Sequence, residues 1–331
     1  MTRPIALTCG EPAGIGPELA AKAWNGLRAT LPFFLIGDPS HVPAGTPVAP
    51  ITDPAEAIRA SATALPVLPH AFAGALTPGQ PNPAHAQGVI DVIARGVDLV
   101  RAGAASALCT APIHKQALQD GAGFAYPGHT EYLAALAGVD RVVMMLASPL
   151  LRVVPATIHI PLAGVAAALT PEGLEATIRI THAALIRDFG LPAPRIAVAG
   201  LNPHAGEGGK IGDEEITLIT PVIDRLRAAG LDLSGPHSAD TMFHAAARAR
   251  YDAAIAMYHD QALIPIKTLD FDRGVNLTLG LPFVRSSPDH GTALDIAGQG
   301  VANPASLIEA LTRARDMAAA RDRPCDPDRH A

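Results

Sequence analysis

Short apolar runs alternate along the chain with longer segments that carry a helical pattern of apolar and polar positions. The short runs fit buried strands, and their alternation with helices is typical of an α/β fold with a parallel sheet. Strands are predicted at residues 4–8, 33–37, 105–110, 142–146, 152–158, 195–199 and 253–257.

The clearest helix is predicted at residues 171–189, because Thr170 can cap its first turn and Gly190 can end it in the left-handed conformation. Further helices are predicted at residues 214–229 and 305–320.

Two segments lack a clear periodic pattern. Residues 40–85 are rich in Ala, Pro and short breaks, so we predict an irregular connection there. The charged, Pro-containing segment 321–331 is predicted to be a frayed terminus.

The composition supports a large globular protein. A chain of 331 residues exceeds the size at which one hydrophobic core usually stops growing, so two lobes are expected. A hydrophobic content of 49% with only 17% charged residues argues against disorder.

The charge balance narrows the class of partner. A net charge of -6 and a pI near 6.1 do not suggest the basic patch of a nucleic-acid binder, so we expect a small-molecule partner. No apolar run approaches the roughly 18 residues of a membrane span. The N-terminus leads directly into a strand-like run rather than a signal peptide. We therefore expect a soluble, cytoplasmic protein that binds neither nucleic acid nor membrane.

The three cysteines, Cys9, Cys109 and Cys325, lie far apart and form no C-x-x-C pair. Neither a disulfide framework nor a thiolate metal site is indicated. Cys9 and Cys109 are expected to be small apolar residues near strand ends.

Three histidines, His159, His204 and His259, follow predicted strands in loops rich in Gly, Pro, Asn and Asp. Because parallel strands end at one edge of a sheet, the three imidazoles could converge there as a metal site with an open position. Their separations are too long for a local zinc finger. The alternative is that each is a hydrogen-bonded core residue, which is the commoner role of a lone histidine at a strand end.

Two loops at predicted helix starts are further candidates. The Gly-rich turn 10–17 could present N–H groups to an anion, yet it lacks both the Walker A ending and the G-x-G-x-x-G spacing. In the motif 126–131, Thr130 and Glu131 could serve as helix caps. Alternatively, His129 and Thr130 could hold polar groups of a substrate.

The segment 267–293 is dense in polar groups amid apolar neighbours. Lys267, Asn276 and Arg285 could hold a phosphate or carboxylate, since Arg offers a planar fork and Lys a point charge. A solvated loop with surface ion pairs is the alternative. The scarcity of ordinary Lys and Glu surface chemistry favours binding.

Together these motifs resemble the 4-hydroxythreonine-4-phosphate dehydrogenase family over nearly the whole chain. The resemblance implies a fold similar to isocitrate and isopropylmalate dehydrogenases, with two α/β/α lobes, a cleft between them and an obligate homodimer. The implied first lobe, with a cofactor loop, is residues 1–128 plus 294–331. The implied second lobe, with metal and substrate residues and the dimer interface, is residues 129–293. The motifs are GEPAGIGP at 10–17, GHTE at 128–131, GLNPHAGEGG at 200–209, YHDQ at 258–261 and DHGTA at 289–293.

The resemblance also assigns residues. It implies metal binding at His159, His204 and His259, with one of the three supplied by the partner subunit, and this chain keeps all three residue types. It implies substrate binding at His129, Thr130, Lys267, Asn276 and Arg285.

The implied reaction is NAD-dependent oxidation of 4-phosphooxy-L-threonine at C3, followed by decarboxylation to 3-amino-2-oxopropyl phosphate in vitamin B6 (pyridoxal phosphate) biosynthesis. A divalent cation on three neutral imidazoles would lower the pKa of a bound hydroxyl and stabilise the alkoxide. Asp240 and Asp260 are candidates for proton transfer or for orienting ligands, with helix caps or loop ion pairs as the alternative. Lys267 is a third candidate catalytic residue.

The segment 289–304 resembles the adenosine-binding loop of isopropylmalate dehydrogenases, which favours NAD but is compatible with NADP. Three imidazoles accept several divalent ions, so zinc, magnesium and cobalt are all retained. The candidate cofactor-binding residues are His290, Gly291, Ala293, Leu294, Asp295 and Asn303.

Other activities stay open. A sibling dehydrogenase acting on D-threonate or D-erythronate 4-phosphate can share the metal and phosphate residues. A metal-dependent phosphate-ester hydrolase is disfavoured, because two-metal hydrolases need bridging carboxylates and this chain offers one imidazole trio and a dinucleotide-like loop. A non-catalytic binding module is disfavoured because every polar group that the mechanism needs is retained.

Overall fold

The computed structural model describes residues 3–323, and its contacts divide the chain into two compact units. Unit 1 comprises Met1–Val142 and Leu281–Ala331, and unit 2 comprises Val143–Gly280. The prediction of a frayed terminus at 321–331 falls almost wholly outside the described residues. Both units combine strands with covering helices, so the predicted α/β class is confirmed.

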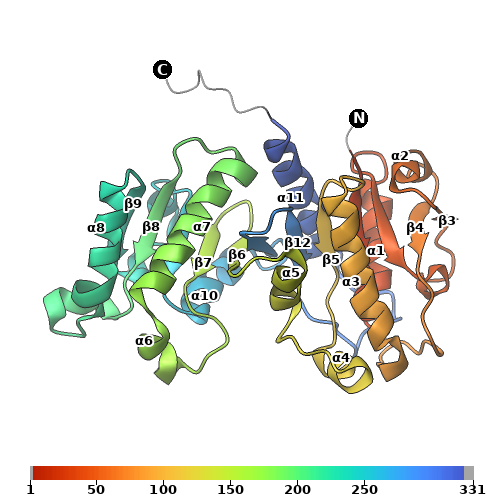
Figure 1. The fold of residues 1–331 in the computed structure, drawn as a ribbon, viewed down its shortest axis with the longest axis horizontal. Helices are drawn as coiled ribbons and strands as arrows, with labels where there is room; N and C mark the ends of the chain where they lie inside the picture. The colour runs from red at the N-terminus through yellow and green to blue at the C-terminus, as the bar shows by residue number, and fades with distance from the viewer. Residues whose placement is uncertain (1–2, 324–331) are drawn as a thin grey trace. The chain divides into compact units, whose positions relative to one another are not determined.

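The strands of unit 1 are parallel and follow the order β3-β4-β2-β1-β5-β12 (Figure 1). Strand β1 is buried along its whole length, as expected for a parallel strand covered on both faces. The loops that follow these strands therefore gather at one edge of the sheet, which is where open α/β sheets bind ligands. The strands are β1 Ile5–Thr8, β2 Phe33–Gly37, β3 Val48–Pro50, β4 Leu65–Pro69, β5 Leu108–Thr110 and β12 Arg285–Pro288.

Helices cover this sheet. Helix α3 contacts β1, β2 and β5, whereas α11 contacts β1, β5 and β12 and packs on α1. A Cβ built at Gly96 of α3 would lie 2.7 Å from Cδ1 of Leu108, so the glycine allows the helix to approach the strands closely. The helices are α1 Gly16–Leu27, α2 Ala57–Ala60, α3 Ala86–Arg101, α4 Lys115–Ala122, α5 His129–Ala137 and α11 Ala305–Arg321.

The strands of unit 2 follow the order β11-β6-β7-β10-β8-β9. Strands β7, β10, β8 and β9 are parallel, whereas β6 is antiparallel to both of its neighbours, so the prediction of parallel strands throughout is wrong. The short turn at 148–151 joins β6 to β7, and a parallel connection would need a crossover of a dozen or more residues. The strands are β6 Val143–Ala147, β7 Arg152–Pro155, β8 Arg195–Ala199, β9 Asp232–His237, β10 Ala253–Ala256 and β11 Val275–Leu279.

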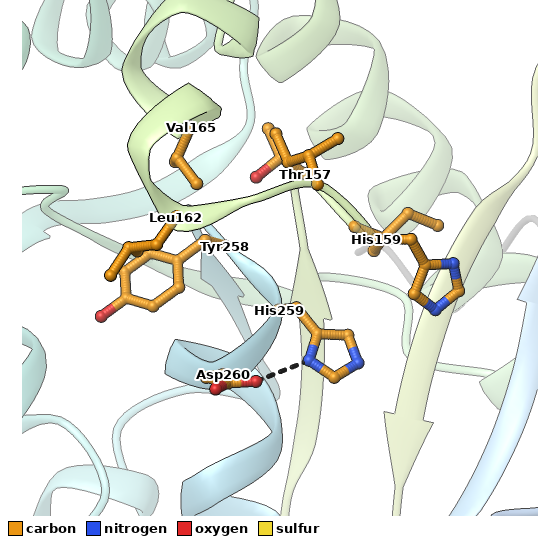
Figure 2. Close-up of a pocket in the computed structure, with 9 residues that line it drawn as sticks. Thr157, His159, Leu162, Val165, Tyr258, His259 and Asp260 are labelled. Atoms are coloured by element: carbon orange, nitrogen blue, oxygen red, sulfur yellow. Dashed lines mark hydrogen bonds and ion pairs between the residues drawn. The ribbon is translucent and has the colours of Figure 1, made fainter.

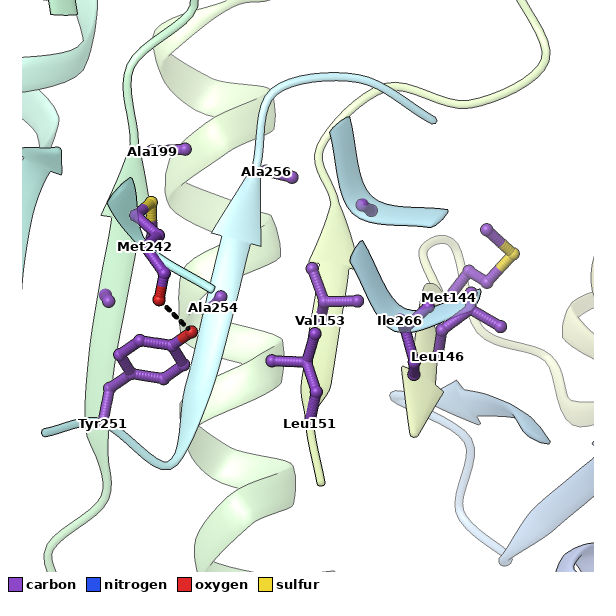
Figure 3. Close-up of a cluster of buried hydrophobic side chains, with 12 residues drawn as sticks. Met144, Leu146, Leu151, Val153, Ala199, Met242, Tyr251, Ala254, Ala256 and Ile266 are labelled. Carbon is purple, nitrogen blue, oxygen red and sulfur yellow. Dashed lines mark hydrogen bonds between the residues drawn. The ribbon is translucent and has the colours of Figure 1, made fainter. Parts of the chain in front are cut away.

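A cluster of buried apolar side chains joins these strands to α10 (Figure 3). Ala254 and Ala256 of β10 and Ile266 of α10 belong to it, and Tyr251 donates a hydrogen bond from its hydroxyl to the carbonyl of Met242 at 2.9 Å. This packing fixes α10 against the sheet. The helices are α6 Val165–Ala168, α7 Pro171–Phe189, α8 Thr220–Ala228, α9 Ala245–Arg248 and α10 His259–Asp270.

Helix α7 has the predicted bounds and caps. The Thr170 hydroxyl accepts the Gly173 N–H at 3.0 Å, and Gly190 has a φ of 66°. The helix predicted at 214–229 instead begins as a π-helical turn, Glu215–Ile219, which α8 continues. The prediction that 40–85 is irregular is wrong, because β3 and β4 lie there and β4 pairs with β2.

The unit boundaries differ from the predicted lobes at both crossings. Helix α5 belongs to unit 1 because it packs on α3, where Arg101 donates to the Leu136 carbonyl at 2.9 Å. Strand β12 belongs there because it pairs with β5.

Cys9 and Cys109 are buried at strand ends, as predicted, and burial raises the pKa of each thiol to about 12. Within residues 3–323, no helix is both long and apolar enough to cross a bilayer.

Candidate functional site

Two of the three predicted metal histidines lie side by side at the carboxyl edge of unit 2. Strands β7 and β10 pair in parallel, and the Ala156 N–H extends the pairing by donating to the Ala256 carbonyl at 2.7 Å. His159 and His259 follow, with ring centroids 5.7 Å apart (Figure 2). A pair of imidazoles this close can share one divalent ion.

His259 opens α10, and the next residue fixes its ring (Figure 2). Asp260 Oδ1 lies 2.7 Å from His259 Nδ1, and a carboxylate can only accept, so Nδ1 carries the proton. The other nitrogen, Nε2, is thereby left as the atom that could bind a metal ion. Gln261 fixes the start of α10 against β10 and β8, because its side-chain oxygen accepts the Met257 N–H at 2.6 Å and its side-chain nitrogen donates to the Gly200 carbonyl at 2.9 Å.

His159 has a strained backbone. Its φ of 53° places it in the left-handed region, which costs an L-residue about 1–2 kcal/mol. Such strain persists only where the surroundings enforce it, and it clusters at functional sites. The strain therefore supports a functional role for His159.

His204 does not join the other two histidines within this chain. It follows β8, which pairs with β10, but it is exposed on the segment Pro203–Gly209 and does not line the cavity that holds His159 and His259. Across residues 3–323, no three His, Cys, Asp or Glu side chains are placed to hold a metal ion together. One chain therefore brings His159 and His259 together and leaves His204 apart, and the family resemblance leads us to expect one of the three imidazoles from a partner subunit.

Three adjoining cavities surround the start of α10. One, of about 340 Å³, is lined by His159, His259 and Asp260. The second, of about 410 Å³, is lined by Asp240 and Asp260, and the third, of about 500 Å³, by His259, Asp260 and Lys267. Asp260 and Lys267 thus line cavities that His259 also lines. Asp240 lines the second cavity, which neither imidazole lines, and its carboxylate accepts a hydrogen bond from the Ser238 hydroxyl at 2.6 Å.

Arg285 is a buried cation in the sheet of unit 1. Only 3% of the residue is exposed, and its Nη2 donates to the Thr110 hydroxyl at 2.7 Å. Burial lowers the pKa of Arg285 to about 10, and the Cys109 thiol opposes that shift. The guanidinium is still charged at neutral pH, and a buried charge gains from an anion that accepts its hydrogen bonds.

His129 lies at the first position of α5, after the N-cap residue Gly128. Thr130 is therefore inside the helix, and the alternative that it is the cap is wrong. Burial lowers the pKa of His129 well below its usual value, with further lowering by Arg285 and Lys115. Its Nε2 atom is buried and has no hydrogen-bond partner among the described residues, so a ligand oxygen would satisfy it.

The other two predicted substrate residues lie in unit 2. Lys267 is on α10, with its Nζ 5.6 Å from the ring centroid of Phe271. Asn276 is on β11, and its Oδ1 is buried without a partner in the described part of the chain. A buried amide oxygen of this kind calls for a donor such as a ligand hydroxyl or ammonium group.

The predicted cofactor segment is an ordered loop without strands, and its end is held to α1. The Glu18 carboxylate accepts the N–H groups of Gly300 at 3.2 Å and Ala302 at 3.0 Å, and Lys22 donates to both carbonyls. The Asn303 Oδ1 accepts the Ala305 N–H at 3.0 Å at the start of α11.

Other predicted residues of this loop have specific contacts. His290 Nδ1 lies 2.9 Å from the Gly291 carbonyl, and its Nε2 is buried with no partner within residues 3–323. Ala293 has a φ of 44°, and the Asp295 carbonyl accepts from Gln299 at 2.7 Å. A Cβ built at Gly79 would lie 2.8 Å from the Leu294 carbonyl oxygen, so the glycine allows the two segments to approach closely.

The Gly-rich turn 10–17 is buried and its N–H groups are engaged within the protein. Glu11 donates to the Pro112 carbonyl at 2.8 Å, Gly14 to the Glu11 carbonyl at 3.0 Å and Ile15 to the Thr292 carbonyl at 3.0 Å. These three N–H groups are therefore not available to an anion, and the turn supports the loop that contains Thr292.

Thr110 and Glu215 were not among the predicted site residues. Thr110 ends an apolar strand at its carboxyl end, and a polar residue in that position was the available signal. Glu215 is 3% exposed and accepts hydrogen bonds from the loop that carries His204. No local pattern distinguishes it from the neighbouring acidic residues.

Comparisons with known proteins cover nearly the whole chain. The profile of the family described as "Pyridoxal phosphate biosynthetic protein PdxA" matches residues 32–314. The 4-hydroxythreonine-4-phosphate dehydrogenase of Ruegeria sp. (strain TM1040) is 67% identical over 317 residues, which span 96% of this chain and 97% of that protein.

Solved structures give the same picture. The 4-hydroxythreonine-4-phosphate dehydrogenase of Klebsiella pneumoniae is 38% identical with a TM-score of 0.87, covering 96% of this chain and all 100% of that one. A terephthalate 1,2-cis-dihydrodioldehydrogenase from Burkholderia xenovorans LB400 is 30% identical with a TM-score of 0.65, covering 96% and 98%. Similar folds therefore carry more than one dehydrogenase substrate.

Proposed function

The chain belongs to the family of the pyridoxal phosphate biosynthetic protein PdxA, and on that premise we propose that it is a dehydrogenase that oxidises 4-phosphooxy-L-threonine at C3. A hydride leaves C3 for a nicotinamide cofactor and the hydroxyl proton leaves for a base. The resulting β-keto acid loses carbon dioxide and takes up a proton to give 3-amino-2-oxopropyl phosphate. The observation that carries the proposal is the His159–His259 pair, with Asp260 fixing one ring.

His159 and His259 fit a divalent metal ion, because their rings are adjacent and the hydrogen bond that His259 Nδ1 donates to Asp260 leaves His259 Nε2 with a lone pair for the ion. When bound, the ion would supply Lewis-acid stabilisation of the oxygen on C3. Zinc, cobalt and magnesium all stay candidates.

We further propose that His204 of a second copy completes the set of three imidazoles. This assignment accounts for two observations, the exposure of His204 and its separation from the other two histidines. The protein would then be a homodimer whose active site draws on both subunits.

The phosphate group of the substrate would be held chiefly by Arg285. A buried guanidinium with a planar fork suits a phosphate, and the adjacent neutral His129 would offer a further hydrogen bond. We propose that His129, Thr130, Lys267, Asn276 and Arg285 together bind the substrate, as the family resemblance implies.

Proton transfer would be carried by residues around the start of α10. Asp260 already bonds to His259, so its role would be to orient that ring, whereas Lys267 and Asp240 line cavities that Asp260 also lines. Lys267 and Asp240 are therefore the proposed proton donor and acceptor.

The cofactor is proposed to be NAD, with NADP as the alternative, bound through the loop that contains His290, Gly291, Ala293, Leu294 and Asp295. The buried Nε2 of His290 offers a polar contact there. Asn303 is also proposed, through atoms other than the Oδ1 that caps α11.

The substrate test is NADH formation by the metal-supplemented protein with 4-phosphooxy-L-threonine, beside D-threonate 4-phosphate and D-erythronate 4-phosphate. We expect turnover with the amino acid alone. Turnover confined to a sugar acid would move the enzyme to the sibling activity, and release of inorganic phosphate without NADH would indicate a hydrolase.

A further inference from the structure

The loop that carries His204 has an unusual backbone. Every residue from His204 to Gly209 has a positive φ, with values of 53°, 51°, 76°, 45°, 67° and 89° along the chain. Three of these residues, His204, Ala205 and Glu207, are not glycine. A left-handed run of this kind persists only when surrounding contacts enforce it.

The carboxylate of Glu215, which follows the loop in sequence, supplies such contacts because the loop folds around it. Its Oε1 accepts the N–H groups of Leu201 and Asn202, each at 2.7 Å, and its Oε2 accepts from the Asn202 side-chain amide at 2.9 Å. The residue is only 3% exposed. These bonds fix the two residues at the entry to the left-handed run.

Glycines let the loop close around this carboxylate. A Cβ at Gly206 would lie 2.6 Å from Glu215 Oε2, and a Cβ at Gly200 would lie 2.9 Å from Oε1. Gly212 meets the Asn202 side chain in the same way, with a Cβ position 2.4 Å from Nδ2. The loop and the carboxylate therefore fit each other closely.

We propose that Glu215 is a positioning residue that holds the loop 200–209 in its left-handed form and so sets where His204 presents its imidazole to the metal site of a second copy. The inference rests on the proposed function, because it takes His204 as the third metal ligand. Glu215 opens a π-helical turn, a local irregularity that is frequent at functional sites.

The hydrogen bonds of Glu215 indicate a role in the loop rather than in the core. Glu215 accepts these hydrogen bonds from Leu201 and Asn202. The helix that follows Glu215 packs through other residues, Val222, Ile223 and Leu226. The neighbouring Glu214 is a matched control. It also accepts from the Asn202 amide, at 2.6 Å, but it receives no hydrogen bond from the backbone of Leu201 or Asn202.

The test measures Co²⁺ affinity of the metal-free, full-length protein by visible absorption, so it does not depend on enzyme activity. The variants are Glu215→Gln, Glu214→Gln, His204→Ala and the double variant Glu215→Gln/His204→Ala. Sedimentation and melting temperature report assembly and fold. If Glu215→Gln does not fold, Glu215→Asp, which keeps the charge on a shorter side chain, replaces it.

We expect Glu215→Gln to weaken Co²⁺ binding at least about 10-fold, as loss of an orienting contact does at other metal sites. Glu214→Gln should change it by no more than about twofold. In the His204→Ala background, Glu215→Gln should cause no further loss, because both changes act through one imidazole.

Two results would overturn the proposal: wild-type affinity in Glu215→Gln, or the same fractional loss with and without His204. If His204→Ala itself binds Co²⁺ like the wild type, the third ligand of the proposed function is wrong and this inference goes with it. If His204→Ala loses Co²⁺ affinity but Glu215→Gln binds Co²⁺ like the wild type, this inference is wrong and the proposed function stands.

Discussion

The two groups of candidate functional residues differ in how completely one chain builds them. In unit 1, Arg285 is 3% exposed, donates a hydrogen bond to Thr110 and lies near His129, whose imidazole is buried and neutral. In unit 2, the side chain of His259 is 35% exposed, His159 sits on strained backbone and His204 is elsewhere.

The two sites are therefore organised in different ways. Burial preorganises the Arg285 group, so a phosphate would meet a charge that is already fixed and desolvated. The imidazole pair has one fixed ring, and residues 3–323 of one chain place no third ligand beside it, so under the proposed function its completion would depend on assembly.

Replacing His204 should have the largest effect on the incomplete site. We expect His204→Ala to weaken metal binding by more than about 100-fold, with weak residual binding through His159 and His259, and to lower kcat/KM by more than about 1,000-fold, since loss of an orienting partner alone costs about 10- to 100-fold. An exposed loop side chain carries little packing energy, so the melting temperature should stay nearly constant. Metal content by mass spectrometry, with circular dichroism alongside, checks both; a full complement of metal in the variant would contradict the account.

Replacing Arg285 should damage the preorganised site without affecting metal. Arg285→Lys loses the planar fork, and two weakened charged hydrogen bonds amount to about 3 kcal/mol, or roughly 100-fold in kcat/KM. Thr110→Val, which removes one bond to Arg285, is the milder control. Steady-state kinetics with phosphorylated and unphosphorylated substrate test the assignment, and an equal loss with both would argue against phosphate binding.

A substitution of Asp260 tests the His159–His259 pair of one chain separately from His204. Asp260→Asn keeps an acceptor for His259 Nδ1 but removes the charge, so metal affinity should fall about 10-fold. A metal titration measures this. Unchanged affinity would mean that the carboxylate does not orient the ring.

The buried site should also impose a pH dependence on stability. The pKa of His129 is lowered in the folded protein. Below the ordinary histidine pKa of about 6.5 the unfolded chain therefore binds more protons than the folded protein, and the free energy of unfolding decreases as the pH decreases. The loss of stability should be visible between about pH 7 and pH 5.5. Urea unfolding of the wild type and His129→Gln at both pH values should show a shallower fall in the variant; equal slopes would contradict the assignment.

Some elements were predictable because their signals are local. Helix α7 carries its own N-cap and glycine stop, and β2 and β8 are apolar runs whose bounds the structure reproduces. Strand β4 was missed because Pro66 and Pro69 suggest a break. Strand β12 was missed because its residues are polar, although they are buried and Ser286 bonds to the Ala310 carbonyl at 2.8 Å.

The sequence singles out candidate histidines, but it does not predict how they are arranged. Histidines after strands marked the edge of the sheet, and the adjacency of His159 and His259 follows from the pairing of β7 and β10. The position of His204 depends on a left-handed loop and on Glu215, which no short-range pattern encodes.

The most direct test of an assembled metal site is subunit complementation. His204→Ala and His159→Ala chains are co-expressed with different tags, and the mixed dimer is purified and assayed with metal. If His204 acts across the dimer, one site per mixed dimer is intact and activity should reach about half that of the wild type. If His204 serves its own chain, both sites are damaged and the mixed dimer should be as inactive as either parent.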